Sequence, residues 1–194
     1  MKQHISARFI AMACALWLPT AAQVDAAELK ETIPNRIKTE LVMKIEVKTG
    51  PIEDMGKGSE GPRINYPIIG GSFIAKGPDG ATFTGEVVPG GADFSIERND
   101  GVTKIDALYR LKTDDGQIII VHNYGLWRAT EQGMAKMAKG QPPIGEGDSY
   151  VRTVPSFSTQ PGKYDWLEDY TYVGTLDYPA MGEVVVDVHR VDGP

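Results

Sequence analysis

The alternation of apolar and polar residues with a period of two constrains the fold of this chain more than any other feature of the sequence. Over Lys38–Thr49, the apolar residues Leu41, Met43, Ile45 and Val47 occupy every second position, which is typical of a strand with one buried face. We therefore expect an all-β fold. The same pattern predicts further strands over 81–88, 92–98, 103–113, 117–125, 149–159, 169–178 and 183–191.

Short turn motifs separate several of these strands. The segments Pro78–Gly80, Asn99–Gly101 and Asp114–Gly116 each end in glycine, which supplies the positive φ that tight turns require. Turns this short join antiparallel neighbours, and periodicity leaves two architectures open, a closed barrel or a two-sheet sandwich. The only helix we expect is a short one in a loop near 129–140, where Gly133 lowers the helix propensity by about 1 kcal/mol relative to Ala.

The N-terminal residues have the three-part pattern of a secretory signal peptide. Two basic residues precede the ten apolar residues Phe9–Leu18, and small residues follow. A helix of ten residues is about 15 Å long, too short to cross a bilayer, so we expect no stable membrane anchor. We expect cleavage after Ala26 or Ala22 and a periplasmic or secreted protein.

Charge and cysteine content exclude several classes of function. The chain has 20 basic and 26 acidic residues without a basic cluster, which argues against a nucleic-acid partner. The one cysteine, Cys14, lies in the predicted leader, so we expect neither a disulfide nor a thiolate zinc site in the mature chain. His122 and His189 lie on separate predicted strands and are a weak metal signal. Phosphate-binding loops and hydrolase nucleophile motifs are missing from the sequence, and we expect no cofactor.

Asp93 and Asp106 are the candidate catalytic residues. They lie on two predicted strands joined by the Asn99–Gly101 turn, so we expect them to be neighbours within reach of one pocket. Alternation places Asp93 on the same strand face as Ser95 and Glu97. Burial raises the pKa of a carboxylate and a nearby arginine lowers it, which is how a protein makes an acid or base that works near neutral pH. The alternative is that both carboxylates lie on a solvated face.

Five further residues are candidates for ligand binding. Arg98 and Arg152 carry a planar fork of donors that suits an anionic or carbonyl group, although each could equally form a salt bridge on the barrel rim. We expect Phe94, Tyr109 and Trp166 to form aromatic walls of the pocket. Large aromatic residues are more often simply part of the core, and that alternative stays open.

Several motifs in a fixed order resemble the bacterial domain of unknown function 3237 family, also known as uncharacterised protein family 0311. The motifs are GGAD (90–93), IDA (105–107), TDDG (113–116), RTVPSFST (152–159) and YDWL (164–167). The resemblance spans about Thr39 to Val191 and implies a single antiparallel barrel of calycin-like or lipocalin-like shape, but no established activity. Family members usually carry arginine where Leu108 stands here. The recurring positions that it implies are Asp93, Arg98, Asp106, Tyr109, Arg152, Phe157 and Trp166. The resulting division is a signal peptide over 1–26, a tail over 27–37 and a β-barrel domain over 38–194.

Two kinds of function fit these residues. The first is an exported barrel that holds a small, partly apolar ligand in its lumen. The second is a cofactor-independent isomerase, lyase or hydratase, in which an aspartate transfers a proton and an arginine or tyrosine stabilises an oxyanion. If the barrel did not close, its exposed edge strands would favour a homodimer.

Overall fold

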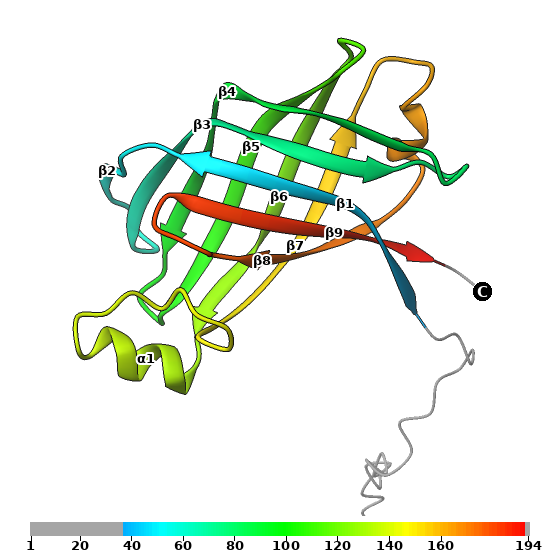
Figure 1. The fold of residues 1–194 in the computed structure, drawn as a ribbon. Helices are drawn as coiled ribbons and strands as arrows, with labels where there is room; N and C mark the ends of the chain where they lie inside the picture. The colour runs from blue at the N-terminus through cyan, green and yellow to red at the C-terminus, as the bar shows by residue number, and fades with distance from the viewer. Residues whose placement is uncertain (1–36, 193–194) are drawn as a thin grey trace, which may run out of the picture. The chain divides into compact units, whose positions relative to one another are not determined.

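The computed structural model describes residues 37–192, in which nine strands form one antiparallel sheet (Figure 1). The helical elements are α1 (Glu131–Met137) and a short 3₁₀ helix (Asp165–Glu168). The strands are β1 (Lys38–Thr49), β2 (Glu53–Lys57), β3 (Pro62–Lys76), β4 (Thr82–Glu97), β5 (Val102–Thr113), β6 (Ile118–Ala129), β7 (Ser149–Ser158), β8 (Tyr172–Asp177) and β9 (Glu183–Asp192).

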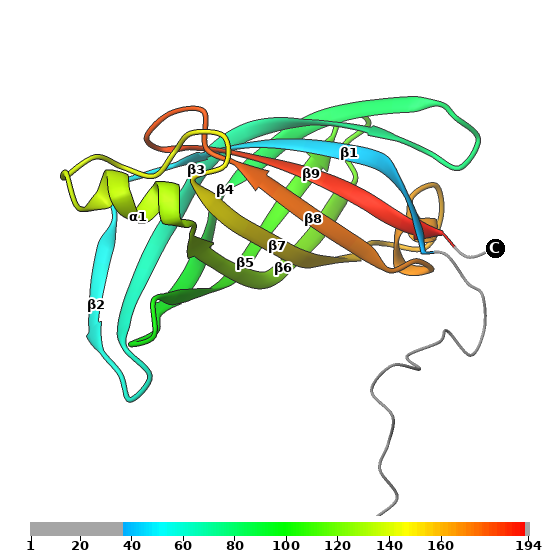
Figure 2. The same cartoon turned by 90° about the horizontal axis from the view of Figure 1, so that it is seen from below.

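A pairing between β1 and β3 closes the sheet into a barrel. The strand order is β1-β9-β8-β7-β6-β5-β4-β3-β2, and because β1 also pairs with β3, every strand except β2 belongs to the ring. The predicted single antiparallel barrel with one short helix is confirmed, and the sandwich is excluded. A homodimer was expected only if the barrel did not close, and it stays a prediction; among the described strands, β2 alone lies outside the ring. Figures 1 and 2 both place β2 and α1 toward the same end of the barrel.

Glycine pairs let β3 and β4 bend around the barrel. The register of the β3–β4 pair shifts between Ile68 and Ser72, where Gly70 and Gly71 lie. Gly71 has a φ of +140°, and a Cβ atom there would lie 1.9 Å from the carbonyl oxygen of Glu46 on β1. The close approach that closes the barrel therefore requires glycine at this position.

The strand predictions need two corrections. The segments 81–88 and 92–98 are one bent strand, β4, because Pro89, Gly90 and Gly91 bend the chain without ending its pairing. The strands β2 and β3 were not predicted as strands. Prolines and glycines interrupt the alternation in β3, and every residue of β2 is exposed.

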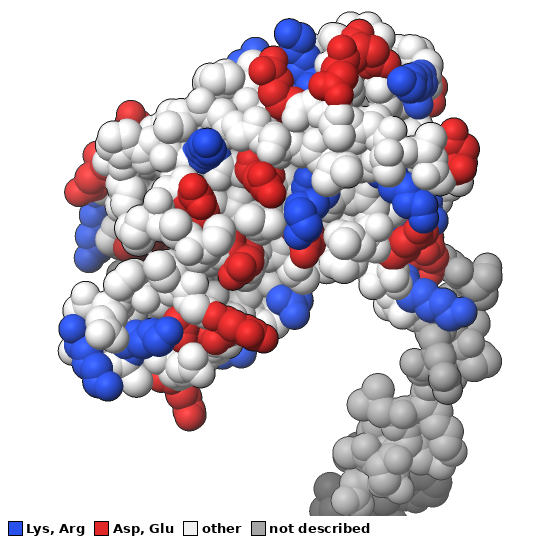
Figure 3. Space-filling model, viewed as in Figure 1, with Lys and Arg blue, Asp and Glu red and all other residues white. Residues whose placement is uncertain are grey.

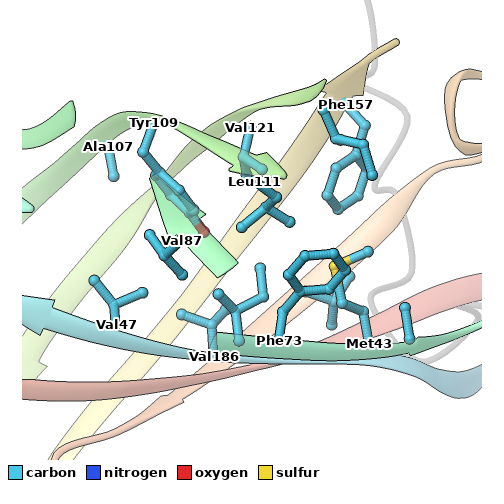
Figure 4. Packing of buried hydrophobic residues seen from close by; sticks show 14 of the residues in the cluster. Met43, Val47, Phe73, Val87, Ala107, Tyr109, Leu111, Val121, Phe157 and Val186 are labelled. Atoms are coloured by element: carbon cyan, nitrogen blue, oxygen red, sulfur yellow. The ribbon is translucent and has the colours of Figure 1, made fainter. Parts of the chain in front are cut away.

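Side chains fill one half of the barrel interior. Tyr164 and Leu167 close this end from the segment around the 3₁₀ helix, and the hydroxyl of Tyr164 donates a hydrogen bond to Asp115 Oδ2 (3.0 Å). Phe157 and Tyr172 pack edge to face with ring centres 5.0 Å apart. Further along the barrel, Figure 4 shows Tyr109 on one wall and Val47 and Val186 on the opposite wall pointing into the same interior.

The helix α1 and the loop after it lie at the other end of the barrel. The side chain of Thr130 caps α1 by accepting a hydrogen bond from the Gly133 N–H (3.2 Å). The buried carboxylate of Asp148 holds the loop by accepting hydrogen bonds from Lys136 Nζ (2.5 Å) and the Gly145 N–H (2.7 Å). Within residues 37–192, neither the length nor the hydropathy of any helix would allow it to cross a membrane.

Candidate ligand pocket in the barrel lumen

The unfilled half of the barrel contains a cavity of about 530 Å³ that opens toward α1. Its walls come from β1, β3, β4, β5, β6, β8 and β9, and Met137 and Pro142–Ile144 line its mouth. A cavity of this size is typical of a small-molecule site. The apolar side chains of its wall include Val47, Ile68, Ile105, Trp127, Leu176, Val184 and Val186.

A polar row crosses this apolar wall at one level of the barrel. Tyr66 on β3 is the register partner of Asp93 on β4, Asp93 pairs with Ala107 on β5, and Ala107 pairs with Asn123 on β6. Neighbouring strands are about 4.8 Å apart, so Asp93 and Asn123 are separated by about two strand spacings. The small side chain of Ala107 leaves space between them. We call Tyr66, Asp93 and Asn123 the polar row.

Two buried side chains of the pocket each have a polar atom without a hydrogen-bond partner among the described residues. Tyr109 is 3% exposed and Asn123 is 2% exposed, and both line the cavity. The Tyr109 hydroxyl and Asn123 Oδ1 make no hydrogen bond with the described residues. A buried polar group left unpaired costs about 1–3 kcal/mol.

Asp93 is the carboxylate of the polar row. Its Oδ1 accepts a hydrogen bond from the Asp106 main-chain N–H (2.9 Å), and its Oδ2 accepts one from the Ser95 hydroxyl (2.9 Å). Burial raises the pKa of Asp93, while these two hydrogen bonds oppose the rise. Burial also raises the pKa values of Tyr66 and Tyr178, with the charge of Asp93 contributing, so both phenols remain protonated beside it.

The structure separates the two candidate catalytic aspartates, contrary to the expectation of one shared pocket. Asp93 lines the lumen, whereas the Asp106 side chain is half-exposed on the outer face, where Asp106 Oδ1 lies 2.7 Å from His122 Nε2. The hairpin makes the two backbones neighbours, but alternation along each strand directs the side chains to opposite faces. Leu108 is 50% exposed, so it does not line the lumen either.

Of the five candidate binding residues, Arg98 and Tyr109 line the cavity. Arg98 lies just past the end of β4, at the mouth, and its guanidinium forms an ion pair with Asp100. Phe94 is 47% exposed on the outer face of β4.

Two other candidates lie away from the cavity. Arg152 is exposed on β7, where its Nη1 donates to the Val151 carbonyl (2.6 Å) and its guanidinium lies 5.3 Å from the Tyr150 ring centre. Trp166 belongs to the 3₁₀ helix and packs against the core at the filled end of the barrel.

Sequence reasoning missed four residues of the pocket. Asn123 and Trp127 lie at the same parity on β6 as the buried residue Val121, so alternation could have placed them inward. Tyr66 lies in β3, where no strand was predicted. Tyr178 lies at the end of the predicted strand over 169–178 and at the same parity as Leu176, which also lines the cavity, so alternation could have placed it inward too, although β8 itself ends at Asp177.

Charged side chains of both signs lie on the outer surface (Figure 3). Figure 3 shows lysine and arginine interspersed with aspartate and glutamate on the face that it presents. In residues 37–192, no three His, Cys, Asp or Glu side chains gather into a group that could hold a metal ion.

Together, the closed antiparallel ring and its internal cavity define a β-barrel with a ligand-sized lumen. The chain belongs to the family described as protein of unknown function DUF3237, whose model matches residues 37–191. A UPF0311 protein of Rhodopseudomonas palustris is 34% identical over 155 residues, which cover 80% of this chain and 97% of that protein. A UPF0311 protein of Bradyrhizobium diazoefficiens is also 34% identical, with the same coverage.

Solved structures show the same fold. A conserved protein of unknown function from Rhodopseudomonas palustris is 33% identical, with a TM-score of 0.70 over 81% of this chain and 99% of that chain. A β-barrel-like protein from Acinetobacter baumannii is 27% identical, with a TM-score of 0.68 over 84% of this chain and 100% of that chain. An enzyme from Penicillium herquei, 22% identical with a TM-score of 0.58 over 84% of this chain and 100% of that chain, shares the fold alone.

Proposed function

We propose that this barrel binds a small, partly apolar molecule in its lumen. The observation that carries the proposal is the presence of two unpaired polar atoms, the Tyr109 hydroxyl and Asn123 Oδ1, in the wall of a mainly apolar cavity of about 530 Å³. Polar groups of this kind fix the orientation of a ligand, and the apolar wall supplies most of its affinity. The polar row and Tyr109 contact the polar end of the molecule, and Trp127 and the aliphatic wall contact its body.

Native mass spectrometry of the protein purified from its own cells tests this proposal. We expect a retained small molecule in the wild-type protein, and its loss in Tyr109→Phe combined with Asn123→Leu. Arg152→Ala is the matched control because Arg152 lies outside the lumen. Retention of the same mass in the double variant, or a lumen that takes up no small molecule from a cell extract, would contradict the proposal.

Asp93 favours a second candidate function, that of a cofactor-independent enzyme. A carboxyl group whose pKa is raised by burial, in a lumen that also holds the protonated phenols of Tyr66 and Tyr178, has the properties of a general acid or base beside oxyanion donors. Isomerases, lyases and hydratases that move a proton at carbon need no more than these groups.

Comparing Asp93→Asn with Asp106→Asn tests the enzymatic candidate. The two variants remove the same charge, one from the lumen and one from the outer face. A screen for exchange of carbon-bound hydrogen with deuterium from the solvent, in a panel of enolisable carbonyl compounds, should find activity in wild type and Asp106→Asn. Equal exchange in Asp93→Asn would exclude Asp93 as the proton-transfer group.

We also propose that the protein is exported. The support is the signal-peptide pattern of residues 1–26, which lie outside the described residues and before residue 37, where the family match begins. Cell fractionation with N-terminal sequencing tests this. A mature protein in the periplasm or medium that starts at Ala27 or Gln23 is expected, whereas an intact N-terminus in the cytoplasm would contradict it.

A further inference from the structure

We propose that the polar end of the lumen ligand is a protonated amine. This inference rests on the proposed binding function and adds the chemical class of the ligand. Four features of the lumen favour a cation over a neutral or anionic group: its acidic residues, a partly buried carboxylate without a counter-cation, its aromatic side chains and an unpaired acceptor.

An acidic stripe runs along the inner face of β4 from the mouth to the polar row. Glu97, Ser95 and Asp93 occupy successive inward positions, and all three line the cavity. Successive inward positions on a strand are about 6.7 Å apart, so the stripe leads from the mouth into the interior. Glu183 adds a third carboxylate to the lining.

The carboxylate of Asp93 has no cationic partner. Its two hydrogen-bond donors are a main-chain N–H and the Ser95 hydroxyl, both neutral. Arg98 is the only cationic side chain among the described residues that line the cavity, and Asp100 already engages its guanidinium. Charges removed from water in proteins are normally paired, and Asp93 is partly buried, so an ammonium group from the ligand would complete this site, and a carboxylate there would be repelled.

The remaining polar and aromatic groups favour the same ligand. Asn123, two strands away from Asp93 across Ala107, has an unpaired acceptor in Oδ1 that an N–H donor would satisfy. Trp127 and Tyr66 line the same cavity, and aromatic faces attract cations through their quadrupole.

Three ligands with the same apolar body and different polar ends test the inference. Isothermal titration calorimetry at neutral pH with octylamine, octanol and octanoate should give affinities in that order, with octylamine about tenfold tighter than octanol because a charge-assisted hydrogen bond is about twice as strong as a neutral one. Octanoate should bind most weakly. Octanol or octanoate binding as tightly as octylamine would overturn the inference and leave the binding function standing, whereas no binding of any of the three would overturn both.

Two variants link this preference to the lumen. Asp93→Asn should reduce the preference for octylamine over octanol to near unity while octanol still binds. Asp106→Asn, which removes a carboxylate from the outer face, should leave the preference unchanged. If Asp93→Asn does not fold, Glu97→Gln in the same stripe should reduce the preference by a smaller factor. A preference that survives in both lumen variants would overturn the assignment.

Discussion

At the residue scale, Asp93 makes the stability of the protein depend on pH. Burial raises the pKa of Asp93 in the folded protein above the unfolded value of about 3.9. The free energy of unfolding therefore falls as the pH rises from the unfolded pKa to the raised folded pKa. The total loss is about 1.4 kcal/mol for each pH unit between these two pKa values. Below this window both states bind the proton and the penalty vanishes.

Asp93→Asn removes this penalty. Urea denaturation at a series of pH values should show the free energy of unfolding of Asp93→Asn rising relative to that of the wild type as the pH increases above the unfolded pKa of about 3.9. Asp106→Asn is the control for a general effect of lost charge. A difference that stays constant, or falls, across this range would contradict the burial of Asp93.

Tyr109 gives a prediction in which stability and binding change in opposite directions. Its hydroxyl is buried and unpaired, so Tyr109→Phe should raise the free energy of unfolding of the ligand-free protein by about 1 kcal/mol. The same change should weaken binding of the proposed ligand, since it removes a hydroxyl that we propose contacts its polar end. A lower stability in denaturation experiments would mean that the hydroxyl already has a partner, such as an ordered water molecule.

Individual site residues were only partly predictable from the sequence. Alternation along β4 grouped Asp93 with Ser95 and Glu97, and the three share the lumen face. The pattern cannot say which of two polar faces is inner, because a lumen that holds polar groups resembles a solvated face. Asp106 was expected beside Asp93 because a short turn joins their strands, but the register pairs Asp93 with Ala107 and so directs Asp106 to the opposite face.

At the element scale, Gly133 in α1 has a role opposite to the one that helix propensity suggests. A Cβ atom at Gly133 would lie 2.0 Å from the main-chain oxygen of Asp148 and 3.3 Å from Pro143 Cβ. The glycine therefore lets the loop that lines the mouth pack against the helix.

Gly133→Ala should destabilise the protein by about 1–3 kcal/mol through overpacking, although alanine is the better helix former by about 1 kcal/mol. Thermal denaturation measures the change. Ala135→Gly, at an exposed position of the same helix, changes helix propensity without changing packing and should lower the free energy of unfolding by about 1 kcal/mol. A more stable Gly133→Ala variant would show that the loop does not pack there.

Strands with an uninterrupted period of two were predicted nearly to the residue. The strand β1 has the predicted bounds, and β5 and β7 differ from theirs by one residue at one end. Strand β3 was not predicted because Pro62, Pro67 and the glycines at its bend interrupt the alternation of apolar and polar residues. The same residues bend β3 so that it can pair with β1. The strand that closes the barrel is therefore one that alternation does not predict.

At the scale of the whole molecule, closure depends on the approach of β1 to β3 at Gly71. A side chain at this position would collide with the Glu46 carbonyl, 1.9 Å from the new Cβ, and would also require an unfavourable φ of +140°. Gly71→Ala should therefore lower the free energy of unfolding by about 3 kcal/mol or more and expose the edges of both strands.

Size-exclusion chromatography and thermal denaturation together measure this effect. We expect self-association of Gly71→Ala at concentrations where wild type elutes as a single species. Ser72→Ala, at the neighbouring exposed position, should retain wild-type behaviour. A stable Gly71→Ala that elutes like wild type would show that β1 and β3 can separate locally without opening the ring.

The β1–β9 pairing determines when the barrel can be completed. Lys44 and Asp187, which form an ion pair between these strands, are 143 positions apart in the chain. A ribosome must therefore synthesise almost all of the domain before its first strand meets the last one, and the loop that must close is long. Until the last strand has been synthesised, the ring therefore stays open.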